Sequence, residues 1–117
     1  MSKPRSNLKR YILRVLYLIY SNDAFVYNYV FIQNAIVITG CDTGFGEATS
    51  LRLAQMGFHV ISACYSPEGA ARLRGSVSLA VVCDVTKEED IAALVEDTAQ
   101  LLAAKKLKLW GLVCNAG

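Results

Sequence analysis

Three glycines within eight residues directly follow a short apolar run, and this feature constrains the fold more than any other. The run is AIVI, residues 35–38, and the glycine-rich segment is TGCDTGFG, residues 39–46. Glycine loses more backbone freedom on folding than any other residue, so three of them after a strand indicate a place where β-carbons would not fit. The first turn of a doubly wound α/β fold needs one glycine for the tight turn, one for the approach of a phosphate and one for close helix packing. Gly40, Gly44 and Gly46 fit these roles, and the next helix supplies free N–H groups for an anion.

From residue 34 onward, short apolar runs alternate with helical patterns. The expected strands are 35–39, 58–64, 79–85 and 109–114. The expected helices are 47–56, a short basic one after the turn at 65–69, and a long one that begins at a capping box of Thr86 with Glu89 and ends at the lysines of 105–108. This alternation predicts an α/β fold with helices on both faces of a parallel sheet. We therefore expect a Rossmann-like doubly wound sheet that stops after its fourth strand.

The first 33 residues form a separate basic segment. Five lysines and arginines precede the first acidic residue, and removing their charges from the net charge of +2 leaves −3 for the rest. A helix over 8–21 would be amphipathic, with Arg10 and Arg14 opposite its apolar face, which favours a membrane-surface anchor within residues 8–32 over nucleic-acid binding. A true span over 11–32 is less favoured because it contains Arg14 and Asp23, and a poorly ordered N-terminus is the third alternative. The predicted division is 1–33 for this segment and 34–117 for the nucleotide-binding part.

The four cysteines are too widely spaced for a metal site or a disulfide framework. They are Cys41, Cys64, Cys83 and Cys114. No two form a C-x-x-C pair, and each ends an apolar run, so we expect buried free thiols in a reducing environment and no metal.

Three motifs in a fixed order resemble the short-chain dehydrogenase/reductase family. They are Thr39-Gly40-x-x-x-Gly44-x-Gly46, Asp84-Val85-Thr86 and Asn115-Ala116-Gly117. TGCDTGFG, GA-x-x-LRG at 69–75 and LWGLVCNAG at 109–117 are similar to the retinol and hydroxysteroid dehydrogenase branch, with 3-hydroxybutyrate dehydrogenase as a neighbour. The resemblance covers 36–117. It departs from the family at Cys114, where an asparagine is common.

The resemblance implies a site for a dinucleotide cofactor. The implied cofactor-binding residues are Thr39, Gly40, Gly44, Phe45, Gly46, Asp84, Val85, Asn115, Ala116 and Gly117. The glycines would line the pyrophosphate, Asp84 would bind the adenine amino group beside Val85, and the 115–117 segment would lie along the cofactor. The end of the second expected strand, Ala63-Cys64-Tyr65, has neither an acid for a ribose nor an arginine for a 2′-phosphate, so NAD is favoured over NADP only weakly.

The family's catalytic serine and Tyr-x-x-x-Lys motif have no counterpart in these 117 residues, where no tyrosine has a lysine four positions later. We therefore expect the cofactor-binding part of an NAD(P)-dependent oxidoreductase acting on a retinol- or steroid-like alcohol or ketone, itself inactive. The lipophilic substrate and a homo-oligomer are expected only in a full-length form, and the expected location is the endoplasmic reticulum membrane, or the cytosol if the N-terminal helix is no anchor. The alternative is a short isoform that acts as a nucleotide-binding or interaction module.

Overall fold

The computed structural model describes residues 32–116, and these form one α/β unit. Its elements in chain order are β1 (Asn34–Thr39), α3 (Gly44–Gln55), β2 (His59–Cys64), α4 (Pro67–Leu73), β3 (Leu79–Val82), α5 (Glu88–Lys105) and β4 (Lys108–Val113). All seven expected strands and helices are present. The expected helix at 8–21 and the anchor at 8–32 lie outside the described residues, apart from Ile32, and so does Gly117.

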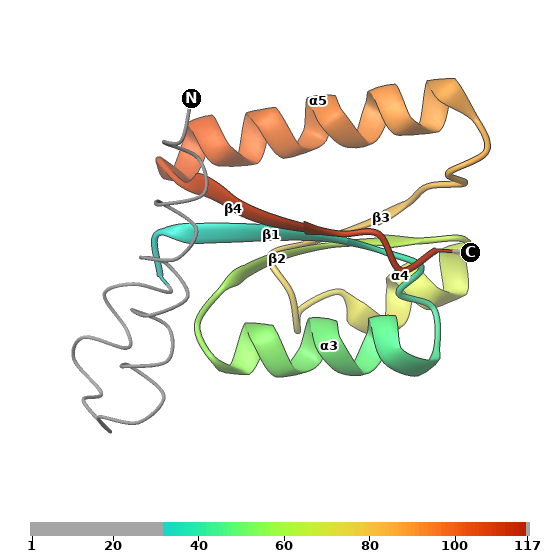
Figure 1. The fold of residues 1–117 in the computed structure, drawn as a ribbon, viewed down its shortest axis with the longest axis horizontal. Coiled ribbons are helices and arrows are strands. Elements are labelled where there is room, and N and C mark those ends of the chain that lie inside the picture. Colours follow the sequence, from blue (N-terminus) through green and yellow to red (C-terminus); the bar gives the residue numbers. More distant parts are fainter. Residues whose placement is uncertain (1–31, 117) are drawn as a thin grey trace, which may run out of the picture. The chain divides into compact units, whose positions relative to one another are not determined.

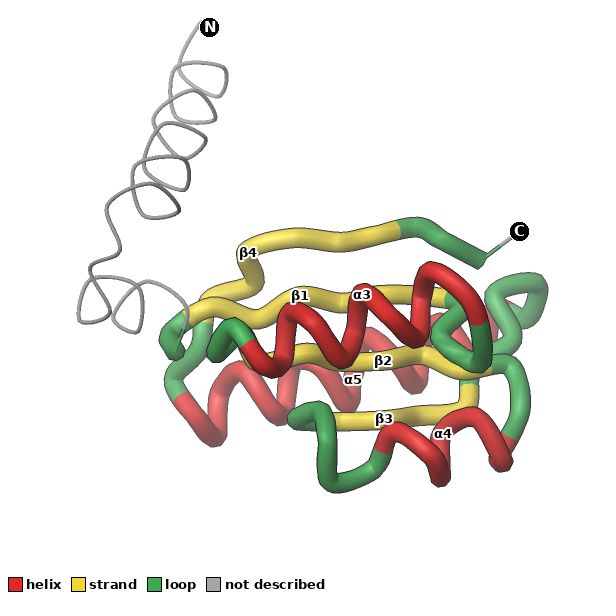
Figure 2. The backbone as a smooth tube through the Cα atoms, turned by 90° about the horizontal axis from the view of Figure 1, so that it is seen from below, coloured by secondary structure: helices red, strands yellow, loops and turns green. Residues whose placement is uncertain are grey.

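The four strands form one parallel sheet in the order β3-β2-β1-β4. Figure 2 shows them side by side in this order. The chain moves outward from β1 through β2 to β3 and then returns to place β4 on the other side of β1. The order therefore reverses between β1 and β4, and ligands of open α/β sheets bind at the carboxyl ends of the strands at such a point. The Rossmann-like fold class is confirmed.

Helices cover both faces of this sheet. Figure 1 shows α5 on one face and α3 with α4 on the other. Alternate residues of the central strands face opposite layers, as the pleat requires. The core beneath α5 contains Ala35, Val37, Ile61, Ala63, Cys83 and Leu94. Ile36, Ile38 and Val60 have the opposite parity and are also buried, so both faces of β1 and β2 contribute to the core. This explains why their sequences are continuous apolar runs.

Strand β4, at one edge of this sheet, is much less covered than β1 beside it. Leu109 and Leu112 are more than half exposed, while Trp110 packs on Phe58 with ring centroids 5.4 Å apart. An apolar groove of about 590 Å³ runs between β4 and α5 and is lined by residues such as Leu94, Leu102 and Leu112. Side chains on an outer strand have a neighbouring strand on one side alone, which accounts for this exposure.

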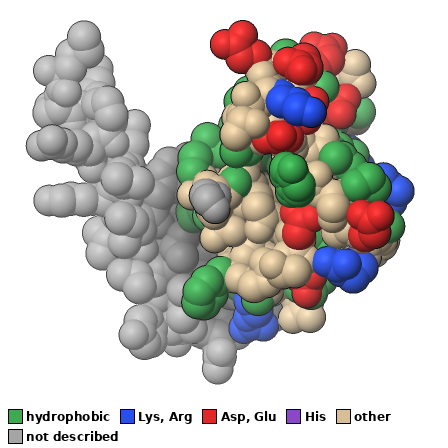
Figure 3. Space-filling model, turned by 90° about the vertical axis from the view of Figure 1, so that its right-hand side faces the viewer, with side chains coloured by type: hydrophobic (Ala, Val, Ile, Leu, Met, Phe, Trp, Pro, Cys, Tyr) green, Lys and Arg blue, Asp and Glu red, His purple; other side chains and the backbone are tan. Residues whose placement is uncertain are grey.

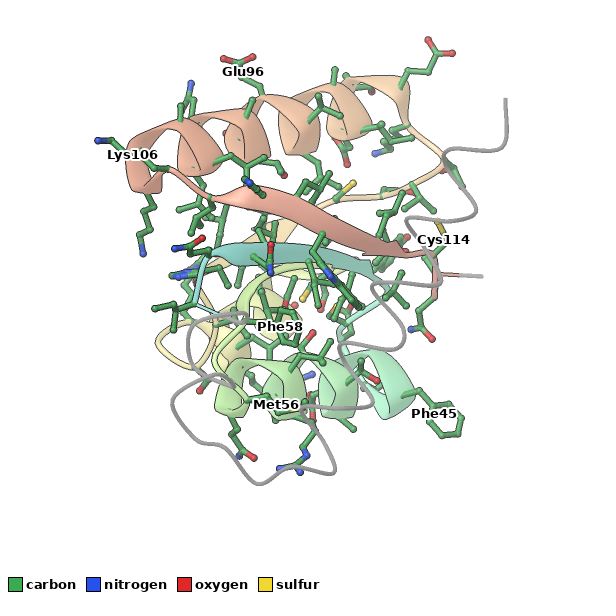
Figure 4. All side chains as sticks on the ribbon, turned by 60° about the vertical axis from the view of Figure 1, so that its left-hand side comes forward. Phe45, Met56, Phe58, Glu96, Lys106 and Cys114 are labelled. Carbon is green, nitrogen blue, oxygen red and sulfur yellow. The ribbon has the colours of Figure 1, made fainter. Side chains whose placement is uncertain are left out.

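Three of the four cysteines are buried free thiols, as expected, but Cys114 is exposed. The prediction of burial was wrong there because Cys114 follows the outer strand and lines the open groove instead of the closed core. Figure 4 shows it at the end of β4.

The expected capping box of Thr86 with Glu89 is also wrong. The N-cap residue of α5 is Lys87, which makes no side-chain capping bond. The Thr86 hydroxyl instead donates to Asp84 Oδ1 at 2.7 Å, because β3 ends at Val82 and the following residues form a loop. Acidic residues still occupy the first turn of α5, where they favour the positive end of the helix dipole: Glu88, Glu89 and Asp90.

No helix within residues 32–116 is long and apolar enough to cross a membrane.

Candidate functional site at the carboxyl edge of the sheet

The ends of β1 and β4 are joined by the hydroxyl of Thr39. Its Oγ1 accepts the backbone N–H groups of Asn115 and Ala116, each at 3.1 Å, and lies 3.5 Å from the carbonyl oxygen of Val113 as a donor. Thr39 is only 8% exposed, so these bonds are largely shielded from water. This side chain therefore brings the glycine-rich turn and the 115–116 segment together at the point where the strand order reverses.

Two of the three glycines are required by close packing around the same point. Gly40 has φ +69°, and a β-carbon there would lie 2.9 Å from the backbone of Ala116. A β-carbon on Gly46 would lie 2.7 Å from Asn115 Nδ2 and even closer to the carbonyl oxygen of Gly40. That oxygen accepts a hydrogen bond from Asn115 Nδ2 at 3.0 Å. The turn, the start of α3 and the end of β4 thus approach each other too closely for side chains.

Gly44 differs from the other two because the space around it is open. It has φ +64°, and a β-carbon there would meet no atom within 4 Å. Gly44 is the first residue of α3, and its N-cap, Thr43, makes no side-chain capping bond. No side chain of the N-cap residue occupies the N–H groups of this first turn, and no β-carbon at Gly44 obstructs the approach to them, an arrangement suited to an anion such as a phosphate.

Phe45 lies at the rim of this opening. Its side chain is 87% exposed, and Figure 4 shows it pointing away from the body of the protein at the start of α3. Among the exposed large hydrophobic residues of the described part of the chain, Phe45 has the largest exposed fraction.

Asp84 and Val85 lie in the loop after β3, not within the strand as expected. Asp84 Oδ1 accepts the backbone N–H and the hydroxyl of Thr86, at 3.0 and 2.7 Å, and these bonds lower the pKa of its carboxyl. Its own N–H donates to Asp90 Oδ2 at 2.9 Å. Val85 lines the groove between β4 and α5. The carboxylate is thus held ionised at the loop that follows the third strand.

Asp42 is a site residue that the sequence reasoning missed. Its Oδ1 accepts the N–H of Tyr65, and its Oδ2 accepts the N–H and the hydroxyl of Ser66 at 2.8 and 2.7 Å. Burial opposes ionisation of Asp42, but these hydrogen bonds outweigh it and lower its pKa. Asp42 therefore ties the glycine-rich turn to the end of β2. The sequence feature that could have identified Asp42 is its position within the glycine-rich turn, two residues after Gly40.

Charged neighbours surround Asp42. Arg72 of α4 donates to the backbone carbonyl of Asp42 and lies 3.7 Å from the carboxylate of Glu47. Figure 3 views the molecule from the carboxyl ends of the strands and shows acidic and basic side chains together on this face.

A buried chain of hydrogen bonds supports the turn from beneath. Ser62 Oγ on β2 donates to Ser50 Oγ on α3 at 2.9 Å, Ser50 donates to Cys41 Sγ at 3.3 Å, and the Cys41 thiol donates to the carbonyl of Ile38. Both serines are fully buried. Burial raises the pKa of Cys41, so the thiol stays protonated and can donate. Each of these polar groups is satisfied, which fixes α3 against the sheet.

Comparison with known proteins agrees with this geometry. A family model described as "short chain dehydrogenase" matches residues 34–117. Human retinol dehydrogenase 16 and human 17-beta-hydroxysteroid dehydrogenase type 6 are each 42% identical over 85 residues, which are 70% of this chain and 26% of each relative. A solved 3-ketoacyl-(acyl-carrier-protein) reductase from Brucella melitensis, complexed with NADH, is 33% identical with a TM-score of 0.51. The match to it covers 57% of this chain and 29% of the reductase.

The chain thus spans about a quarter of the length of these curated relatives. It matches the family model over its whole described sheet, from β1 onward. By its sequence and its fold, the chain belongs to the short chain dehydrogenase family.

Proposed function

We propose that residues 34–117 bind NAD(H) and form the cofactor-binding part of an NAD(P)-dependent oxidoreductase. The observation that carries this proposal is the open space at Gly44, at the uncapped start of α3 and at the point where the strand order reverses. Pyrophosphates of dinucleotides bind at such a place, since the backbone can approach them only where no β-carbon intervenes. The related reductase was solved in complex with NADH, which supports this choice of ligand.

The remaining residues of the site take roles that follow from their placement. Gly40, Gly44 and Gly46 line the pyrophosphate, with Phe45 at the rim. Both bonds from Thr86 go to Asp84 Oδ1, which leaves Oδ2 for the adenine amino group beside Val85. Thr39 holds Asn115 and Ala116 along the cofactor through its two accepted N–H bonds. The bound cofactor would supply hydride chemistry, and the residues of this chain bind and orient it.

We propose a retinol- or steroid-like alcohol or ketone as the substrate of the complete enzyme, because the relatives named above are retinol and 17-beta-hydroxysteroid dehydrogenases. The 117 residues contain no tyrosine followed four positions later by lysine. Hydride transfer needs a proton donor held beside the reacting carbon, so this chain alone should oxidise no alcohol. Formation of NADH from retinol or a hydroxysteroid by the purified chain would contradict this.

For the location, we propose that residues 8–32 attach the protein to the endoplasmic reticulum membrane. For the oligomeric state, we propose that full-length subunits form a homo-oligomer. The basic, amphipathic pattern of that segment supports membrane attachment. Deleting residues 1–22 should release a reporter fusion from membranes. Continued sedimentation of the deleted fusion with membranes would count against the anchor.

The cofactor proposal is tested by titrating NADH into the purified chain and following the fluorescence of NADH. We compare Gly44→Val with Gly75→Val, because Gly75 also has a positive φ, +85°, and open space around its β-carbon, but it lies after α4. Both variants place a β-branched side chain at a positive φ, and circular dichroism checks that each variant keeps its secondary structure. We expect saturable binding by the unsubstituted chain, at least about tenfold weaker binding by Gly44→Val and little change in Gly75→Val. Equal effects of the two substitutions, or no saturable binding by the folded chain, would refute the proposal.

A further inference from the structure

The end of β2 lacks an acidic residue that is common in dinucleotide-binding folds, and a carboxylate from another loop lies at its place. Doubly wound dinucleotide-binding folds commonly place an acid about 20 residues after the glycines, at the end of β2, where it accepts the hydroxyls of the adenosine ribose. Here β2 ends in Cys64, followed by Tyr65, so that acid is missing. None of residues 63–65 carries a carboxylate.

Asp42 brings a carboxylate to this place from a different loop. Its oxygens accept the backbone N–H groups of Tyr65 and Ser66, the two residues that directly follow β2. The hydroxyl of Ser66 also donates to Oδ2 and itself accepts the N–H of Gly69, so the carboxylate is held in a fixed orientation at the start of α4. A β-carbon on Gly69 would lie 2.5 Å from Asp42 Oδ2, which shows how closely the two loops approach.

The carboxylate of Asp42 accepts hydrogen bonds from the end of β2 and remains partly exposed. A carboxylate has about four lone-pair sites. Oδ2 accepts two hydrogen bonds, and Oδ1 accepts one. The backbone N–H of Asp42 also stabilises this carboxylate, and the side chain is only half-buried, so its negative charge acts on any group that approaches the end of β2.

The charges around Asp42 favour a neutral ribose over a phosphate. The guanidinium of Arg72 contacts this turn. It donates to the backbone carbonyl of Asp42 and forms an ion pair with Glu47. Two carboxylates and one guanidinium leave the cluster with a net charge of −1. A ribose 2′-hydroxyl can donate to a carboxylate, whereas a 2′-phosphate dianion is repelled by it.

We infer that Asp42 selects NAD(H) over NADP(H) by placing a carboxylate at the end of β2, where the 2′-phosphate of NADP(H) would otherwise bind. This inference rests on the proposed function. Asp42 thereby replaces, from the β1–α3 turn, the acid that other dinucleotide-binding folds carry at the end of the second strand.

The test measures the dissociation constants of NADH and NADPH for the full chain at low ionic strength. The variants are Asp42→Asn, Glu47→Gln, which removes the neighbouring charge, and Asp97→Asn, which makes the same substitution at an exposed position of α5. We expect the unsubstituted chain to bind NADH at least about tenfold more tightly than NADPH, since a carboxylate and a dianion a few ångströms apart repel even in water. Asp42→Asn should reduce this ratio about tenfold, mainly by tightening NADPH. Asp97→Asn should leave it unchanged.

The outcomes separate this inference from the function on which it rests. If the folded chain binds neither dinucleotide, the proposed function fails and the inference fails with it. If NADH binds but NADPH binds equally well, or if Asp42→Asn keeps the preference, the cofactor proposal stands and the role of Asp42 is refuted. An equal loss of preference in Glu47→Gln would likewise overturn the assignment to Asp42. Thermal unfolding of each variant identifies one that has lost its fold, and Asp42→Ser, which keeps a small acceptor without charge, then takes the place of Asp42→Asn.

Discussion

Replacing Gly46 by alanine tests whether the close approach of α3 to the glycine-rich turn is essential for stability. Gly46 is buried within the first turn of α3, and its substituted β-carbon would lie well inside van der Waals contact with the Gly40 carbonyl oxygen and Asn115 Nδ2. Helix propensity alone predicts the opposite effect, because alanine stabilises a helix by about 1 kcal/mol relative to glycine. The sign of the change therefore distinguishes the two effects.

The magnitude follows from three contributions. Overpacking of a well-packed site costs about 1–3 kcal/mol. Displacing Asn115 from the Gly40 carbonyl loses a hydrogen bond, which contributes about 0.5–1.5 kcal/mol. After subtracting the gain in helix propensity, we expect the free energy of unfolding to fall by about 0.5–3.5 kcal/mol, which lowers Tm by roughly 4–8 °C per kcal/mol for a domain of this size.

The assay is urea unfolding of the full chain followed by far-ultraviolet circular dichroism. The control is Ala48→Gly, an exposed position of the same helix, which measures the helix-propensity difference without a steric clash. Asn115→Ala combined with Gly46→Ala separates the clash with the side chain from the clash with the carbonyl oxygen. A Gly46→Ala chain as stable as the unsubstituted one, or more stable, would refute the argument from close packing.

Three further predictions concern single side chains. Cys114 should react with a thiol reagent in one fast phase that Cys114→Ser abolishes, while the buried thiols stay protected, since burial raises the pKa of Cys64 to about 12. Fast reaction of a second thiol in the folded chain would contradict this. Thr39→Val should lower the free energy of unfolding by about 1–3 kcal/mol because two shielded backbone N–H groups lose their acceptor, and Thr39→Ser should restore most of it; equal urea midpoints for both variants would argue against the bridge. The pKa of Asp42 is lowered from 3.8, so its contribution to stability is present above that value and is lost as the pH falls through the folded-state pKa; the unsubstituted chain should therefore lose stability more steeply below about pH 4 than Asp42→Asn, and parallel pH profiles would show that the hydrogen bonds of Asp42 do not favour its ionised form.

The elements and the fold class could be predicted because they depend on local patterns. Continuous apolar runs of five to seven residues indicate doubly covered strands, and β1 and β2 differ from their expected bounds by only one residue at their starts. The glycine roles followed from spacing alone, and the structure places Gly40 and Gly46 in tight contacts and Gly44 beside open space. Cofactor binding by these residues stays a prediction.

What could not be predicted depends on contacts between distant loops. The bonds of Asp42 to Tyr65 and Ser66 join residues 23 and 24 positions apart, and no periodic pattern marks them. The capping box failed because α5 begins at Glu88 with Lys87 as its N-cap, which places Thr86 one residue too early to accept the N–H of the first turn; its hydroxyl donates to Asp84 instead. Cys114 resembles the other cysteines in its local sequence, and only the position of β4 at the outside of the sheet makes it exposed.

The bridge made by Thr39 has a consequence for the synthesis of the protein. Its hydroxyl on β1 meets the N–H of Asn115, which lies 76 residues later in the chain. At 5–20 residues per second, a ribosome needs about 4–15 s to travel that distance. During this interval β1, β2 and β3 can already pair, but the side of β1 that β4 will occupy remains an unpaired edge, open to other nascent chains. The pairing of β1 with β4 is therefore the last of these three strand pairings to form, and a ligand bound at this point would stabilise the four-stranded arrangement in preference to every shorter intermediate.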